Sequence, residues 1–170
     1  MKIDTKKIVL CALFTALVAV STMVIQIPSP MNGYVNLGDV FVLFGAFLLG
    51  PVLGAVSAGL GSMIADFATG YAIYAPASFL IKATMAVVAG LIFKSFNKRT
   101  KHAVVGVIIA GIIAELIMVV GYFGYSALIM GEGIAAAASI PGNLVQGAVG
   151  IAVSAVLYVA LKNTKFLLVW

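Results

Sequence analysis

The stretch VFVLFGAFLLGPVLGAVSAGLGSMIADF, residues 40–67, decides how this chain must fold. It carries a single charged side chain, and its other residues are mostly apolar or small. Gly50-Pro51 divides the stretch, because a proline inside a helix removes a backbone donor and clashes with the preceding turn. The sequence therefore predicts a short helix over residues 39–49 and a second helix over residues 52–67. Small side chains in the second helix would let a neighbour approach closely, and they include Gly54, Ala58 and Gly61.

The same apolar character extends over the whole chain. Of its 170 residues, 64% are hydrophobic and 9% are charged, and the mean hydropathy is +1.22. A soluble domain carries about 25% charged residues and roughly 45–50% apolar residues. Apolar runs of about 20 residues recur, and each is long enough to cross a hydrocarbon core about 30 Å thick. Because the runs do not alternate, they indicate helices rather than barrel strands. The sequence predicts an all-α integral membrane protein.

The break points predict one domain over residues 1–170, a bundle of six transmembrane helices. The expected helices cover residues 8–27, 39–49, 52–67, 75–96, 103–129 and 141–162. A polar connection with the turn signal Asn32-Gly33 follows the first helix, and Ser139 is the expected N-cap of the last. The N-terminus looks like a signal peptide, with a basic start and an apolar run. It lacks a clear A-x-A site, so we expect a retained first helix.

Basic residues gather on one side of this predicted bundle. They precede the first helix, separate the fourth from the fifth and follow the sixth: Lys2, Lys6, Lys7, Lys94, Lys98, Arg99, Lys101, His102, Lys162 and Lys165. The opposite connections carry Asp39, Asp66 and Glu132, with no Lys or Arg. The positive-inside rule then places both termini in the cytoplasm. Clustering at helix ends also argues against nucleic acid as the reason for the net charge of +5.

Two ionisable side chains, Lys82 and Glu115, lie well inside the predicted helices. Glu115 interrupts the apolar run AGIIAELIMVVGYF, residues 110–123. From a rise of about 1.5 Å per residue, Lys82 lies roughly 10 Å below the outer start of its helix, and Glu115 roughly 18 Å from a cytoplasmic start. The two are expected at comparable depth. Such groups cost several kcal/mol in a membrane and normally face a partner or a cavity. One interpretation is a Lys82–Glu115 salt bridge that only fixes the bundle; the other is the floor of a pocket.

Further polar and aromatic residues are expected on the outer half of the last three helices. Aromatic walls would stack a ring, and amide and charged groups would give direction. The candidate substrate-binding residues are Tyr34, Asn36, Tyr74, Lys82, Glu115, Tyr122, Asn143 and Gln146. Tyr34 and Asn36 lie in the first outer connection and are expected to form a lid. Asp39 is expected to cap the helix over residues 39–49, and Asp66 to be solvated or to anchor a loop.

The sequence lacks the motifs of several enzyme classes. It has no Walker A loop and no H-E-x-x-H, and its single histidine, His102, lies in a basic connection. The one cysteine, Cys11, excludes an internal disulfide and a cysteine metal cluster. We expect no catalytic site, metal or cofactor in this chain. An autonomous proton-coupled transporter using Glu115 is the alternative, although no repeat typical of that class is evident.

The segment NLGDVFVLFGAFLLGPVLGAVSAGLGSMIADFATGYAIYAPASFLIKATMAVVAGLIF, residues 36–93, resembles the substrate-binding S components of energy-coupling factor (ECF) vitamin transporters. The six predicted helices and the Ala12/Ala16 step near the inner end of the first helix add to this resemblance, which covers nearly the whole chain.

The resemblance implies a membrane-embedded subunit that captures a vitamin outside, under the loop between the first two helices. It also implies that Ala12 and Ala16 dock a partner T protein, which two cytoplasmic ATPases drive with ATP, in a prokaryotic plasma membrane. Within the family the chain looks closest to S components for pyridoxine or hydroxymethylpyrimidine. Neutralisation of Lys82 by Glu115 would argue against a strongly anionic ligand.

Overall fold

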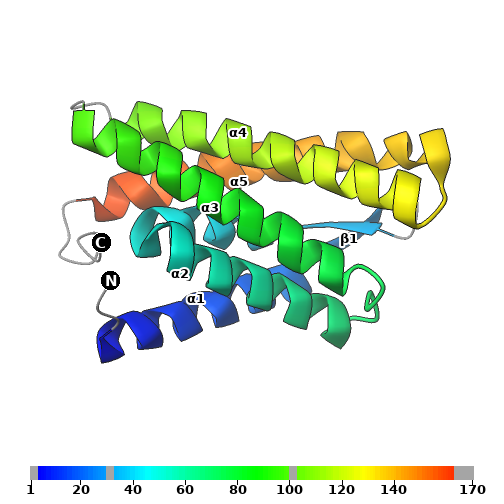
Figure 1. Cartoon of the computed structure of the whole chain (residues 1–170), viewed down its shortest axis with the longest axis horizontal. Coiled ribbons are helices and arrows are strands. Elements are labelled where there is room, and N and C mark those ends of the chain that lie inside the picture. Colours follow the sequence, from blue (N-terminus) through cyan, green and yellow to red (C-terminus); the bar gives the residue numbers. More distant parts are fainter. Residues whose placement is uncertain (1–3, 30–32, 100–102, 163–170) are drawn as a thin grey trace.

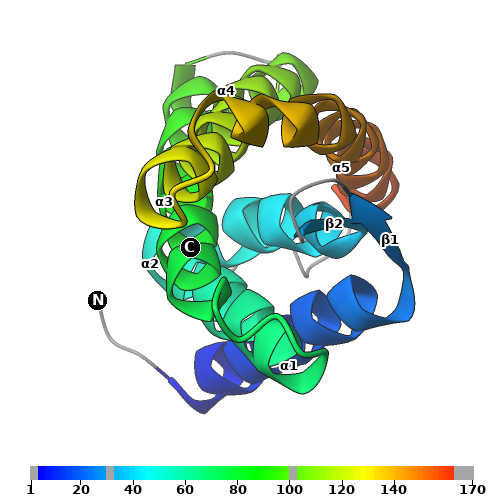
Figure 2. The same ribbon diagram turned by 90° about the vertical axis from the view of Figure 1, so that its right-hand side faces the viewer.

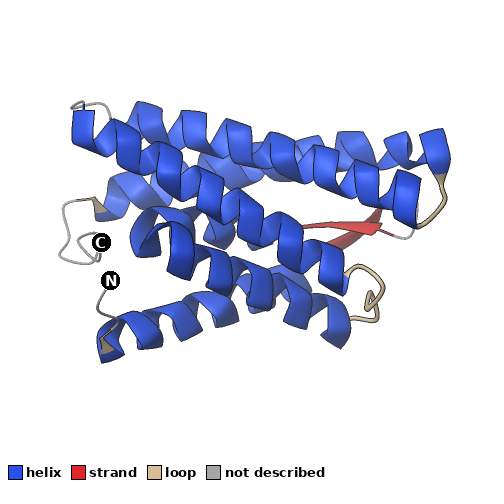
Figure 3. Ribbon diagram, viewed as in Figure 1, coloured by secondary structure: helices blue, strands red, loops and turns tan. Residues whose placement is uncertain are grey.

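The computed structural model describes residues 4–29, 33–99 and 103–162, and almost all of them are helical (Figure 3). Lys2, Asn32, Lys101, His102 and Lys165 from the sequence predictions lie outside the described residues. The elements follow in the order α1 (Thr5–Val24), β1 (Gln26–Ser29), β2 (Gly33–Asn36), α2 (Gly38–Ala68), α3 (Ala75–Arg99), α4 (Ala103–Gly124), the π-helical turn η1 (Tyr125–Ile129), the 3-10 helix η2 (Gly133–Ser139) and α5 (Ile140–Leu161).

The described part of the chain contains five helices that are long and apolar enough to cross a membrane. They pack side by side, and the β1–β2 hairpin lies toward one end of the bundle, hereafter the hairpin end (Figure 1). α1 begins and α5 ends at the opposite end (Figure 1). The membrane-protein prediction agrees with these five helices. The predicted count of six separate helices and the cytoplasmic termini stay predictions.

The difference in count comes from α2, which reverses its course at Gly50-Pro51. Gly50 adopts φ 79° and ψ 178°, a region essentially reserved for glycine. A Cβ added at Gly54 would lie 2.9 Å from the Cα of Ala46. In a straight helix these two residues would be about 12 Å apart along the axis. The predicted segments 39–49 and 52–67 therefore lie on either side of a sharp bend within α2.

The first half of α2 forms the centre of the bundle. Seen from the hairpin end, it lies among α1, α3, α4 and α5 (Figure 2). Its residues from Val42 to Gly50 are all buried, because helices contact it on several sides. Gly90 of α3 packs where α2 bends, and a Cβ there would lie 2.9 Å from the backbone nitrogen of Pro51. The bend thus places a buried helix in the middle of the bundle.

The polar connection after α1 forms the antiparallel β1–β2 hairpin, in which Gln26 pairs with Asn36 and Ser29 with Gly33. α1 ends at Val24, three residues before the predicted end at Ile27. The chain is already extended at Ile25 and proceeds directly into β1. Pro28 fits within this extended strand, since its fixed φ suits an edge strand and not a helix interior.

The capping role predicted for Ser139 is wrong in its mechanism. Ser139 precedes α5, and Pro141 lies in the first turn as expected. However, Ser139 has helical dihedrals and makes no side-chain cap bond, because the 3-10 helix η2 runs directly into α5. Its hydroxyl donates instead to the carbonyl oxygen of Ala136 at 2.8 Å.

Gly61 is a point of close approach between α1 and α2, and it gives a direct test of this packing. A Cβ at Gly61 would lie 2.7 Å from the carbonyl oxygen of Thr15 and 2.7 Å from Cβ of Val18. We expect Gly61→Ala to lower the free energy of unfolding by about 1–3 kcal/mol, as overpacking does. Gly124→Ala is the matched control, because its Cβ would meet nothing within 4 Å. Unfolding in detergent measures both variants, and equal stability of the two would contradict the packing argument.

Candidate functional site

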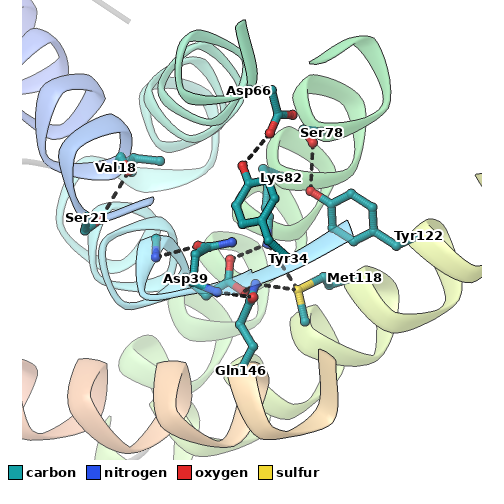
Figure 4. Close-up of polar contacts among 12 residues, drawn as sticks. Val18, Ser21, Tyr34, Asp39, Asp66, Ser78, Lys82, Met118, Tyr122 and Gln146 are labelled. Atoms are coloured by element: carbon teal, nitrogen blue, oxygen red, sulfur yellow. Dashed lines mark hydrogen bonds and ion pairs between the residues drawn. The ribbon is translucent and has the colours of Figure 1, made fainter. Parts of the chain in front are cut away.

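A buried ion pair joins Lys82 of α3 to Asp39 in the first turn of α2. The side chains are only 3% and 1% exposed. The ammonium Nζ contacts Oδ1 of Asp39, and Gln146 of α5 donates from Nε2 to Oδ2 at 2.5 Å (Figure 4). Both carboxylate oxygens are therefore engaged. A buried charge is tolerated only when it is paired and hydrogen-bonded, and here three helices supply the partners.

This pairing corrects two predictions from the sequence. Lys82 contacts Asp39 and not Glu115. Asp39 does not cap α2, because the N-cap position is Leu37 and the Asp39 carboxylate points into the bundle toward α3 and α5. The local capping role falls to Asn36, whose Oδ1 accepts from the backbone nitrogen of Gly38 at 2.8 Å. With Asn36 in that position, the Asp39 side chain is available to Lys82.

The hairpin is fastened to the same network. The backbone nitrogen of Asn36 donates to Oε1 of Gln146 at 2.8 Å, so the amide of Gln146 links the end of β2 to Asp39. A second contact lies nearer the end of α2, where the hydroxyl of Tyr34 donates to Oδ1 of Asp66. A third joins Nε2 of Gln26 to Oγ1 of Thr69 at 3.1 Å. The hairpin is thus held to both α2 and α5.

A polar ladder joins α3 to α4 on the side facing this network. Its rungs are spaced four residues apart on each chain segment: Tyr74–Ser126 at 3.2 Å, Ser78–Tyr122 at 2.9 Å and Lys82–Met118 at 3.1 Å. Residues four apart lie on one face of a helix. Because α3 and α4 run antiparallel, a residue four positions later along α3 contacts a residue four positions earlier along α4. The lowest rung is the ion-paired Lys82, whose Nζ also lies 5.4 Å from the ring centroid of Tyr122.

A cavity lies between the hairpin and this ladder at the hairpin end. It encloses about 40 Å³, enough for roughly three water molecules at 10–15 Å³ each. Its polar lining consists of hydroxyls, amides and one carboxyl, from Ser29, Tyr34, Asn36, Asp66, Tyr74, Ser78, Tyr122, Ser126, Ser139, Asn143 and Gln146. The lining suits a ligand with hydrogen-bonding groups around an aromatic ring.

The phenols at this cavity are hydrogen-bond donors at physiological pH. Burial raises the pKa of Tyr34, and the neighbouring Asp66 carboxylate raises it further. Burial likewise raises the pKa of Tyr74. The Tyr34 ring also packs at a tilt against the Tyr71 ring, with ring centroids 4.5 Å apart. The hydroxyls of Tyr34 and Tyr74 therefore keep their protons and can donate hydrogen bonds.

The structure brings most of the predicted binding residues together. Six of them line the cavity: Tyr34, Asn36, Tyr74, Tyr122, Asn143 and Gln146. Lys82 does not line it and instead forms the ion pair with Asp39. Contact between the predicted binding residues and a substrate stays a prediction.

Glu115 lies apart from this cavity. It lines a second cavity of about 170 Å³ between α4 and α5, and Asn143 lines both. Glu115 is 5% exposed, and neither carboxyl oxygen has a hydrogen-bond partner in the described structure. Close approach of α5 encloses it, since a Cβ at Gly147 would lie 3.0 Å from Cβ of Glu115.

Sequence reasoning missed the serines and was half right about Asp66. Asp66 is not solvated, since it is 2% exposed and belongs to α2. The other expectation, that it anchors a loop, agrees with its hydrogen bond to Tyr34 of the hairpin. The missed serines had a visible signal, because Tyr74, Ser78 and Lys82 form one four-residue stripe and Met118, Tyr122 and Ser126 form another. When two such stripes face each other on antiparallel helices, they predict side-chain contacts between the helices. Asp66 has no such signal in the sequence.

The ion pair predicts a strong effect of removing one partner. Lys82→Met leaves the Asp39 carboxylate buried with only Gln146, so we expect a loss of about 3–5 kcal/mol in the free energy of unfolding. The double variant Lys82→Met/Asp39→Asn removes both charges and should recover most of that loss. Lys162→Met, on an exposed lysine, is the control. Unfolding in detergent measures all three, and a stable Lys82→Met protein would contradict the role of the pair.

Comparison with known proteins shows the family of this chain. The family model described as "ECF-type riboflavin transporter, S component" matches residues 2–163. A Pyrococcus woesei protein described as "Uncharacterized protein in gap 3'region" is 34% identical over 148 residues, 86% of this chain and 95% of that protein. A solved structure described as "Structure and mechanism of the S component of a bacterial ECF transporter" aligns with a TM-score of 0.70 and 28% identity, over 93% of this chain and 96% of the other. This chain belongs to the family of S components of ECF-type riboflavin transporters, the membrane-embedded substrate-binding subunits of ECF importers.

Proposed function

We propose that this chain captures a small, water-soluble heteroaromatic vitamin or vitamin precursor from outside the cell, with pyridoxine or hydroxymethylpyrimidine favoured. The observation that carries the proposal is the hydroxyl- and amide-lined cavity beneath the hairpin. Ring hydroxyls and ring nitrogens of such a ligand match the tyrosine, serine and amide groups of the lining. Among the described residues, the ammonium beside the site belongs to Lys82, and it is already paired with Asp39, which disfavours a strongly anionic ligand.

The volume of the cavity bears on the choice of vitamin. The cavity beneath the hairpin is small, at about 40 Å³, so in this proposal the hairpin moves when the ligand enters. A one-ring compound needs a smaller displacement than the three-ring riboflavin, which the family description names. Riboflavin is therefore the second candidate, favoured by the family match rather than by the cavity.

Ligand entry in this proposal proceeds through the hairpin. Three side-chain contacts hold it closed, made by Tyr34 with Asp66, Asn36 with Gln146, and Gln26 with Thr69. Each is a single hydrogen bond of modest net value, about 0.5–1.5 kcal/mol, or about 1.5–3 kcal/mol where a charged group takes part. The hairpin can therefore open without disturbing the helices. Opening of the hairpin would also affect the ion pair, because the amide of Gln146 contacts both Asn36 and Asp39.

Release inside requires a partner in this proposal, and α1 offers the docking face. Cys11 and Phe14 bury one face of α1 against the bundle, whereas Ala12 and Ala16 are exposed on another. Small exposed residues one turn apart let a partner helix approach closely. The proposed partner is the T protein, driven by two ATPases. An alternative is an autonomous proton-coupled transporter, and the buried, unpartnered carboxyl of Glu115 favours that alternative.

Ligand capture predicts stabilisation of the purified chain by one member of a vitamin panel. The panel contains pyridoxine, hydroxymethylpyrimidine, riboflavin and other B vitamins. At 100 times its dissociation constant, a ligand stabilises the folded state by about 2.7 kcal/mol, which a thermal shift detects. Asn143→Ala should weaken binding at least about tenfold, because a buried amide of the cavity wall is lost. Val145→Ala, exposed on the same helix, should not. Equal binding by both variants would contradict the site.

Partner docking predicts a separate defect when the exposed face of α1 becomes bulky. The double variant Ala12→Leu/Ala16→Leu should keep vitamin affinity but lose co-purification with the T protein and lose ATP-driven uptake in proteoliposomes. Leu13→Ala, also exposed on α1, serves as a control for altered surface. Uptake driven by a pH gradient in vesicles that contain this chain alone would instead support the proton-coupled alternative.

A further inference from the structure

We propose that Asp66 selects the charge of the ligand. Its carboxylate accepts a hydrogen bond from an O–H or N–H group on a neutral or cationic ring, and it excludes phosphorylated or carboxylated forms of the same ring. The inference rests on the proposed function, since it concerns the ligand of the same cavity. It adds a specificity-determining residue and a ligand class defined by charge.

The two oxygens of Asp66 have different surroundings. Oδ1 accepts from the hydroxyl of Tyr34, whereas Oδ2 is buried and has no hydrogen-bond partner in the described structure (Figure 4). Ser78 is a hydrogen-bonding neighbour of the same carboxyl group, and its hydroxyl also shares a hydrogen bond with Tyr122 at 2.9 Å. Buried polar atoms are nearly always hydrogen-bonded. An acceptor at the wall of a cavity, buried and unmatched, is the arrangement that a ligand donor completes.

Asp66 differs in this respect from the carboxylate of Asp39. Asp39 uses both oxygens within the protein, on Lys82 and on Gln146, as a structural carboxylate does. A fastening for the hairpin would require only one acceptor for Tyr34, and an uncharged amide would supply it. The carboxyl group of Asp66 therefore offers one acceptor more than the hairpin contact needs.

The position of Asp66 in α2 strengthens this point. α2 ends at Ala68, and Asp66 lies in its last turn. The C-terminal end of a helix carries a partial negative charge, which disfavours an acidic side chain there. Retaining a buried carboxylate at this position is unfavourable for the fold alone, so its charge points to a function in the cavity.

No positive side chain among the described cavity-lining residues offsets Asp66. It is the only lining residue with a formal charge, and the Lys82 ammonium is committed to Asp39. A phosphate or carboxylate in this cavity would therefore face the Asp66 carboxylate without a cationic lining residue among those described. Such like-charge contacts are a common means of rejecting a wrong ligand. A neutral donor or a cation meets no such repulsion.

The test compares two pairs of probes that differ by one phosphate: pyridoxine with pyridoxine 5′-phosphate, and riboflavin with riboflavin 5′-phosphate. Calorimetry or thermal shift on the purified full chain gives the affinity ratio of each pair. We expect the wild type to bind the neutral member at least about tenfold more tightly, since like charges brought together are strongly unfavourable. Asp66→Asn should weaken the neutral ligand and bring the two affinities to within about threefold.

Two further variants keep the test decisive. Asp4→Asn changes an exposed N-cap at the opposite end of the bundle and should leave the ratio unchanged. Tyr34→Phe removes the hairpin contact but keeps the carboxylate, so it should also keep the ratio, even if Asp66→Asn does not fold. A wild-type ratio near one, an unchanged ratio in Asp66→Asn, or a lost ratio in Tyr34→Phe overturns the inference while ligand capture stands. If no member of the vitamin panel binds the wild type, the proposed function fails and the inference with it.

Discussion

The buried ammonium of Lys82 is the constraint on which the rest of the structure depends. A charge inside a membrane protein needs a partner within the protein, and Asp39 supplies it from the first turn of α2. Gln146 then completes Asp39 and also holds the end of the hairpin through the backbone of Asn36. One ion pair thus fixes the relative positions of α2, α3, α5 and the hairpin. The same pair neutralises the Lys82 ammonium, so no unpaired cation from the described lining residues offsets the carboxyl group of Asp66 in the cavity.

Between this pair and the hairpin end, the bundle changes from a packed core to a polar cavity. Two of the contacts between the α3 and α4 segments, Tyr74–Ser126 and Ser78–Tyr122, join hydroxyls, which could exchange partners with a ligand. Asp66 lies next to Ser78 and shares its carboxylate with Tyr34 of the hairpin. The hairpin, which covers the cavity, is therefore in direct contact with Asp66, the residue proposed to select the ligand. Capture and closure would be linked by a single side chain.

The bend at Gly50-Pro51 makes this arrangement possible. It returns the chain across the bundle within one continuous element, so the first half of α2 lies among all the other helices (Figure 2). Glycine is required at the bend because φ is 79° there, and small residues allow the close approach of α1 and α3. With the polar partners gathered at the hairpin end, α1 keeps an exposed face with Ala12 and Ala16. Ligand and partner would then use separate surfaces.

The sequence by itself determined the membrane-helical class, the interruption at Gly50-Pro51 and six residues that line the cavity. These follow from local rules: apolar length, proline chemistry and the spacing that sets which residues share a helix face. The sequence also carried the two four-residue stripes of α3 and α4, although only their structure shows that they meet. What only the tertiary structure decided is the pairing of charges. Lys82 and Glu115 lie at comparable depth by residue count, yet the rotation and axial offset of α2 and α5 bring Asp39 to Lys82 and leave Glu115 against the glycines of α5. Spacing along one helix specifies a face, whereas the partner of that face depends on how separate helices pack.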